Sequence, residues 1–286
     1  QQRQQALPAH REFWQEQLAA INTTLELPTD RSSQIVGPSA GRLSEFCLPA
    51  ATTARVRQFA ASREVTLHSV LITAWQILLQ RYADESDFAV GVPMSRRGDA
   101  GFLNTVGFLI EALPFPCHVD VRASFEQQVQ HTDTTFRQVA AASTLSVSDI
   151  LALVPRLAPG TGRVPYQTMF VLQGEFPPLL FGDAATTVSH VSDLGAAKFD
   201  LTLFVTHSRT ARELSCQLEY RTSAFNDATV RRIQQHWVTL VDQLVRQPHE
   251  PVGTQNFSGP SDDRVRQRCH HHDWTESSLT RQPAAT

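Results

Sequence analysis

The densest run of chemically active side chains in this 286-residue sequence is Cys269-His270-His271-His272-Asp273. Thiolate, imidazole and carboxylate groups all bind zinc, but a zinc site needs ligands that converge, as in CxxC or HxxxH spacing, together with partners from a rigid frame. Contiguous side chains in a segment poor in apolar residues rarely converge. We therefore expect no metal site, and we interpret this run as part of a solvated linker.

A second motif, Gly37-Pro38-Ser39-Ala40-Gly41, matches the GxSxG pattern of serine hydrolases. That chemistry requires the serine on a sharp turn between a strand and a helix. Here the serine lies in a connector rich in proline and serine, and a strand pattern follows it, so we interpret it as a loop. His68, near the start of a strongly apolar helix, is expected to be a core or interface histidine instead of a catalytic base.

Residues 90–97 (VGVPMSRR) place polar groups at the end of a buried-strand pattern. The strand pattern stops at Pro93, and Ser95 and Arg97 follow at once. A second strand pattern opens about ten residues later. Strand ends are where a rigid scaffold exposes functional groups. On these residues alone, a structural turn is still the simpler interpretation.

The composition argues against several classes of function. The 25 basic and 28 acidic residues leave a formal net charge of −3, whereas a nucleic-acid surface should be visibly basic. No apolar run approaches the roughly 20 residues of a transmembrane helix, and the N-terminal residues do not resemble a signal peptide. The four cysteines contain no CxxC pair, which fits reduced thiols and a cytoplasmic location. The first residue is not Met, so we expect a segment of a longer protein.

Hydrophobic periodicity predicts an α/β fold, with one mixed sheet of about six strands covered by helices on one side. Thr66, Ser124 and either Asn226 or Asp227 are expected to cap helices. Helices are predicted over residues 8–21, 50–63, 67–82, 124–142, 147–157 and 226–246. Strands are predicted over residues 42–48, 88–92, 108–115, 166–173, 187–191, 199–207 and 214–220.

Taken together, the sequence resembles the condensation domain of non-ribosomal peptide synthetases, in particular its C-terminal half. Residues 198–203 are very like the family's KFDLTL, and residues 87–97 resemble its VGTPxSGR segment. Further resemblances cover residues 13–18, 25–31, 67–82, 106–113, 164–173, 218–220 and 273–275. The resemblance implies a chloramphenicol-acetyltransferase-like lobe over residues 41–250. Residues 1–40 would form a lead-in helix and connector between lobes, and residues 251–286 a linker toward an adenylation domain.

The resemblance implies amide-bond formation between an acyl or peptidyl thioester and an aminoacyl amine. Both substrates would arrive on phosphopantetheine arms of upstream and downstream carrier proteins, with no cofactor bound to this chain itself. The family's catalytic histidine belongs to an HHxxxDG motif in the N-terminal lobe. This chain has no such motif, and residues 270–273 do not fit it. The fragment alone is therefore expected to be inactive, with no catalytic residue of its own.

The motif matches suggest where this lobe would meet a substrate tunnel. Ser95 matches the serine of SGR and is a candidate hydrogen-bond donor to a developing oxyanion. Arg97 matches the arginine of that motif, and Glu111 replaces the asparagine of VNT. Lys198 and Asp200 match KFDLTL and are expected to form an internal ion pair.

Two other functions stay open at this point. One is a degenerate, non-catalytic scaffold or carrier-protein docking lobe, which the departures from the family motifs favour. The other is an epimerisation-type domain, which shares the fold. Epimerisation domains usually end a module, so the apparent linker toward an adenylation domain argues against that second alternative.

Overall fold

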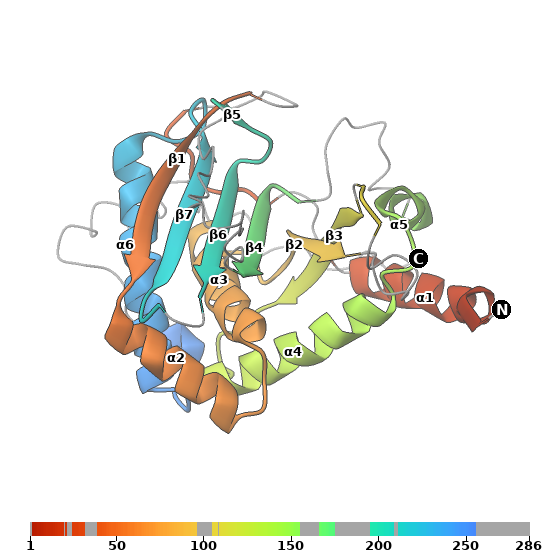
Figure 1. Ribbon diagram of the computed structural model, residues 1–286, viewed down its shortest axis with the longest axis horizontal. Coiled ribbons are helices and arrows are strands. Elements are labelled where there is room, and N and C mark those ends of the chain that lie inside the picture. Colours follow the sequence, from red (N-terminus) through yellow and green to blue (C-terminus); the bar gives the residue numbers. More distant parts are fainter. Residues whose placement is uncertain are drawn as a thin grey trace, which may run out of the picture.

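The computed structural model describes residues 2–19, 21, 25–31, 39–95, 105–107, 109–154, 166–174, 195–208 and 211–255 (Figure 1). A mixed sheet lies at its centre, with strand order β3-β2-β4-β6-β7-β1-β5. β2 pairs with β4 and β4 with β6 in parallel, and the other neighbours are antiparallel. The strands are β1 Ser39–Leu48, β2 Asp87–Ser95, β3 Ile110–His118, β4 Thr168–Gly174, β5 Ala196–Ala197, β6 Leu201–His207 and β7 Leu214–Arg221.

The helices begin largely where the sequence predicts. Thr66 accepts a hydrogen bond from the backbone N–H of Ser69, and Ser124 and Asn226 cap their helices in the same way.

None of the described helices is long and apolar enough to cross a membrane. The helices are α1 Gln2–Ala19, α2 Ala50–Ser62, α3 Leu67–Ala83, α4 Phe125–Ala141, α5 Val147–Leu153, α6 Asp227–Arg246 and the short 3-10 helix η4 Val252–Thr254.

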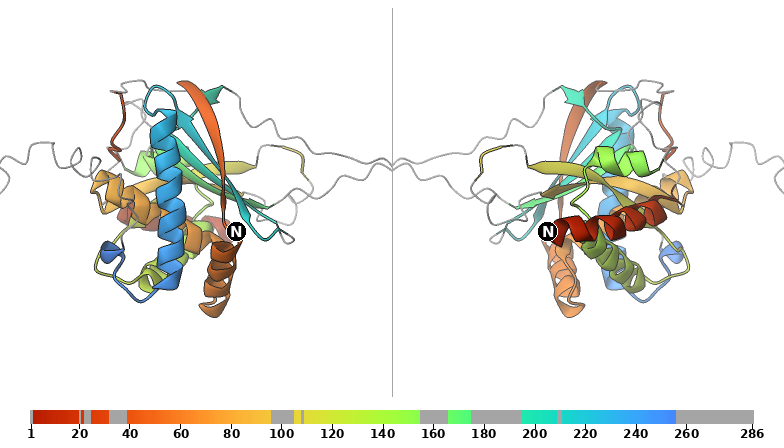
Figure 2. Two further views of the ribbon diagram at one scale, coloured as in Figure 1. Left: turned by 90° about the vertical axis from the view of Figure 1, so that its left-hand side faces the viewer. Right: turned by 90° about the vertical axis from the view of Figure 1, so that its right-hand side faces the viewer.

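One face of the sheet, here called the helix-side face, carries the apolar core. Successive residues of a strand point to opposite sides, so Phe170 of β4, Leu203 of β6 and Leu218 of β7 share this face through their pairing. All three are buried. α3, α4 and α6 contact the strands, and α2 packs on α3 and α6. Figure 2 shows these helices on one side of the sheet, as predicted.

The opposite face, here called the second face, is mixed in character. Gln217 of β7 donates a hydrogen bond to Glu45 of β1 at 3.0 Å. Gln173 of β4 donates to Thr206 of β6 at 3.2 Å. Phe204 is half-buried between these two pairs of polar side chains. This face therefore presents both hydrogen-bonding and apolar groups.

Some predicted boundaries are wrong. Ser39 is not in a loop: it is the first residue of β1, a strand of ten residues. The GxSxG motif therefore lacks the strand-to-helix turn of a nucleophile elbow. α1 begins at Gln2, so Pro8 lies inside the helix. The strand predicted over residues 187–191 and the run at residues 269–273 lie outside the described residues.

Residues 25–31, which precede β1, form hydrogen bonds with the start of α6 and with Gln167, just before β4. Asp30 accepts hydrogen bonds from the backbone N–H of Asn226 and from the hydroxyl of Thr229, both at 2.9 Å. The backbone N–H of Leu25 donates to the side chain of Gln167 at 3.1 Å. Because these contacts join residues far apart in the chain, residues 25–31 pack as part of the lobe.

Candidate functional site

The two described tunnel candidates lie on opposite faces of the sheet. Ser95, the last residue of β2, pairs with Ile110, and the next pair along is Met94 with Glu111. Opposed residues of an antiparallel pair share a face, and successive residues alternate. Met94 is buried in the core, so Glu111 lies on the helix-side face and Ser95 on the second face. Arg97 lies outside the described residues.

The side chain of Glu111 binds the N-terminus of α5. Its carboxylate accepts a hydrogen bond from the backbone N–H of Val147 at 2.6 Å, and Val147 is the first residue of α5. The first N–H groups of a helix have no partner within the helix and favour a negative charge. Ser146 and Asp149 complete the helix start with a capping box. In this arrangement Glu111 anchors α5 to β3.

Tyr166 lies across the second face, close to β2. A methyl group added at Gly91 would lie 2.4 Å from Cε2 of Tyr166, so only glycine lets the ring approach this closely. The hydroxyl of Tyr166 donates to the carbonyl oxygen of Ala112 at 3.0 Å. Burial raises the pKa of Tyr166, and the charge of Glu111 raises it further. Tyr166 therefore stays a neutral donor at physiological pH.

Asp200, in the segment that resembles KFDLTL, forms a different ion pair from the one we predicted. Asp200 pairs with Arg221 at 3.1 Å, and the Arg221 side chain is 9% exposed. The ammonium group of Lys198 instead lies 5.5 Å from the centroid of the Phe199 ring. The sequence could not show this because Arg221 lies on β7, beyond the segment that carries the motif.

His68 is half-buried and packs against two aromatic rings, which fits the expected core or interface histidine. Its ring lies 4.4 Å from the ring of Phe136 and 5.3 Å from that of Phe170, centroid to centroid. Its Nδ1 is buried without a hydrogen-bond partner. Burial lowers the pKa of His68 to about 4, although the charge of Asp133 acts in the opposite direction. His68 is therefore neutral at physiological pH.

Ser95, at the end of β2 on the second face, has no group that could act as a base. Ser95 is exposed and offers one hydroxyl donor. A hydroxyl that stabilises an oxyanion still needs a base from elsewhere. Tyr166, which packs on the second face beside β2, is not revealed by the sequence, because the strand pattern over residues 166–173 includes it. A glycine inside a buried-strand pattern, Val90-Gly91-Val92, was the available signal of a close approach.

The described residues thus form one α/β lobe, a mixed sheet with helices on one face and a second face that carries both polar and apolar groups. The family model for the condensation domain matches residues 1–264. The chain therefore belongs to the condensation domain family.

The relatives are large peptide synthetases. Phosphinothricin tripeptide synthetase PhsB of Streptomyces viridochromogenes is 30% identical over 259 residues, which cover 87% of this chain and 21% of that protein. Surfactin synthase subunit 1 of Bacillus subtilis is 26% identical over 244 residues, which cover 85% of this chain and 7% of that protein. The chain thus spans a small part of these relatives.

Solved structures support the fold. The X-domain in its complex with OxyB from teicoplanin biosynthesis superposes with a TM-score of 0.78 at 20% identity, over 88% of this chain and 56% of that chain. This likeness agrees with the condensation-type lobe that the sequence predicts.

Proposed function

We propose that this chain is the C-terminal, acceptor-side lobe of a non-ribosomal peptide synthetase condensation domain and contributes to amide-bond formation. The amine of a carrier-bound aminoacyl group attacks the thioester carbonyl of a carrier-bound acyl or peptidyl group. A C–N bond forms, the C–S bond breaks, and the amine proton passes to the departing thiolate. The partners are the N-terminal lobe, two carrier proteins with phosphopantetheine arms and a following adenylation domain.

The family match over residues 1–264 carries this proposal. The position of Ser95 agrees with it, because an exposed hydroxyl at a strand end can donate to the oxyanion of the tetrahedral intermediate. The base is expected from the HHxxxDG motif of the N-terminal lobe. The described residues of this chain then contribute orientation and a hydrogen-bond donor.

The test is Ser95→Ala in the complete synthetase, with single-turnover amide formation followed by mass spectrometry. Losing an oxyanion donor typically costs about 10²–10³ in rate, so we expect a decrease of at least tenfold. Ser215→Ala, an exposed serine on the same face in β7, is the matched control and should leave the rate unchanged. An unchanged rate for Ser95→Ala would remove this role. No amide product from the unaltered synthetase would reject amide formation itself.

A second candidate is a non-catalytic docking lobe. The carboxylate of Glu111 is engaged by the start of α5, and the X-domain of similar fold was solved in complex with OxyB. In that case the synthetase would bind its carrier proteins, yet this domain would form no amide. An epimerisation-type domain would instead invert a carrier-bound residue without forming a bond, which chiral analysis of the carrier-bound product would reveal.

A further inference from the structure

A groove of about 600 Å³ lies between the C-terminal half of α2 and the C-terminal end of α6. It is separate from the second face and from Ser95. Guanidinium groups and apolar side chains both line it. The residues that matter here are Arg55, Arg63, Arg246, Phe59, Val245 and Pro248.

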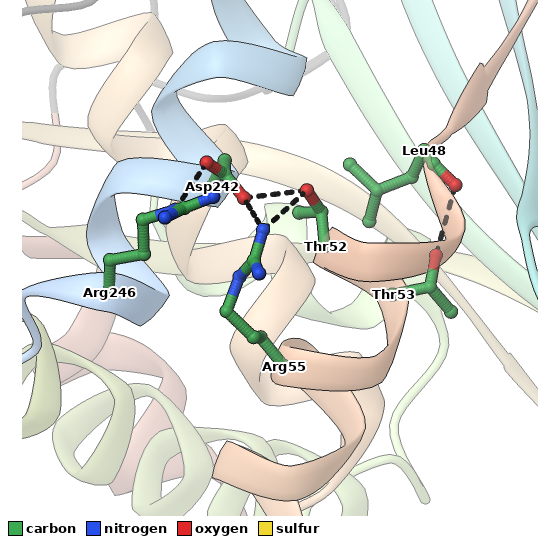
Figure 3. Close-up of polar contacts among 6 residues, drawn as sticks. All are labelled: Leu48, Thr52, Thr53, Arg55, Asp242 and Arg246. Carbon is green, nitrogen blue, oxygen red and sulfur yellow. Dashed lines mark hydrogen bonds and ion pairs between the residues drawn. The ribbon is translucent and has the colours of Figure 1, made fainter.

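Two carboxylates hold the arginines of this groove in place. Asp242 accepts hydrogen bonds from Thr52 at 2.6 Å, from Arg246 at 2.7 Å and from Arg55 (Figure 3). Burial alone would raise the pKa of Asp242, but these donors outweigh it and lower the pKa. Asp242 is therefore charged and orients both arginines.

The second carboxylate belongs to α4. Glu126 pairs with Arg63 at 2.8 Å and with His249 at 3.0 Å. Across the groove, three guanidinium groups thus face two carboxylates. The three guanidinium groups exceed these two carboxylates by one positive charge.

Several N–H donors of this cluster are left without an acceptor. Nε of Arg55 is buried and unpaired. The Nη atoms of Arg246 make no hydrogen bond to any described residue; only its Nε is used, on Asp242. The Arg246 side chain is 57% exposed. Nε of Arg55 is shielded from solvent, but the exposed Nη atoms of Arg246 can bind a planar carboxylate, because a guanidinium carries five donors in a rigid fork.

We propose that the groove between α2 and α6 docks an acidic segment of a partner protein. A carboxylate of that segment binds the exposed Nη atoms of Arg246, Arg55 adds a neighbouring positive charge, and an apolar side chain packs against Phe59 and Pro248. The size of the groove lies within the range of ligand pockets and exceeds what a single small anion fills. The negative charges of Asp242 and Glu126 also repel a compact dianion such as phosphate. Carboxylates spaced along a peptide can bind the arginines while staying away from these two groups. This surface is independent of the proposed amide chemistry.

The test uses the full chain and a fluorescein-labelled peptide of alternating Glu-Glu-Leu units, with binding measured by fluorescence anisotropy. We expect submillimolar binding at 50 mM salt and at least a fivefold loss at 500 mM salt, because exposed charges are screened. Arg55→Gln with Arg246→Gln should weaken binding about tenfold. Arg246→Gln alone should weaken peptide binding about threefold. Because Arg246 is exposed, this single variant tests the proposal if the double variant does not fold.

Arg11→Gln is the matched control, since it removes the same charge from an exposed position of α1, on the other side of the molecule in Figure 1. It should bind the peptide like the unaltered chain. Three results would overturn the proposal: no peptide binding below 1 mM at low salt, unchanged binding by the folded Arg246→Gln variant, or displacement of the peptide by inorganic phosphate at equal concentration. The last result would indicate a small-anion site.

Discussion

On the helix-side face of the sheet, Phe170, Leu203 and Leu218 are at most 1% exposed, whereas on the second face Glu45 is exposed and Phe204 is half-buried. Both faces belong to the same strands, so the difference comes from what covers them. Burying apolar area stabilises the fold by about 25 cal/mol per Å². Truncating a side chain on the helix-side face should therefore reduce stability more than truncating one on the second face.

The largest expected effect is on the helix-side face, at Trp237 of α6. Its side chain is 1% exposed and packs edge-on against Phe46, with ring centroids 6.0 Å apart. Trp237→Ala should lower the free energy of unfolding by about 3–5 kcal/mol, measured by urea denaturation. Phe204→Ala on the second face is the control and should cost less than half as much. Equal losses would show that the two faces are equally buried.

His68 makes the helix-side face sensitive to acid. Its folded-state pKa of about 4 lies below the ordinary 6.5, so protonation favours the unfolded chain. Stability should therefore fall as the pH drops from about 6.5 to about 4, by up to about 3 kcal/mol. His68→Phe should remove this part of the pH dependence, measured as urea midpoints at pH 7 and pH 4.5. The same pH dependence in the variant would show that other groups cause it.

Gly91 tests how tightly the second face is packed beside Tyr166. Gly91→Ala places a methyl group 2.4 Å from the Tyr166 ring and 2.7 Å from Cγ of Met169. Overpacking of this kind should cost about 1–3 kcal/mol. Gly174→Ala is the control, because its added methyl group would lie 3.7 Å from Nε2 of His207, an ordinary contact. If thermal unfolding shows the same small change in both variants, Tyr166 does not pack tightly on β2.

The smallest expected changes in stability come from substitutions at Asp200 and Lys198. Asp200→Asn removes the carboxylate that pairs with the largely buried Arg221 and should cost about 1–2 kcal/mol. Lys198→Gln removes only an exposed contact with Phe199 and should change stability by less than about 0.5 kcal/mol. Urea denaturation of both variants decides between Arg221 and Lys198 as the partner of Asp200. A larger loss for Lys198→Gln would restore the ion pair expected from the sequence.

Local patterns predicted most of the fold. The caps at Thr66 and Ser124, and a cap at either Asn226 or Asp227, could be predicted from the sequence because a cap depends on a side chain and a backbone N–H three residues later. The strand ends were less accurate: Tyr166 was assigned to a strand, yet its ring lies across the sheet. Its aromatic side chain fits a strand pattern equally well, and only the contact with Gly91 distinguishes the two placements.

The α/β class, the order of the helices and of every described strand except β5, and the likeness to condensation domains could be predicted from the sequence alone, because periodicity, caps and motifs are properties of short segments. Tertiary structure alone decided that Ser95 and Glu111 lie on opposite faces, that Asp200 pairs with Arg221, and that arginines of α2 and α6 meet around Asp242. Each of these depends on strand register or on helix packing. Both are set by contacts between segments far apart in the chain.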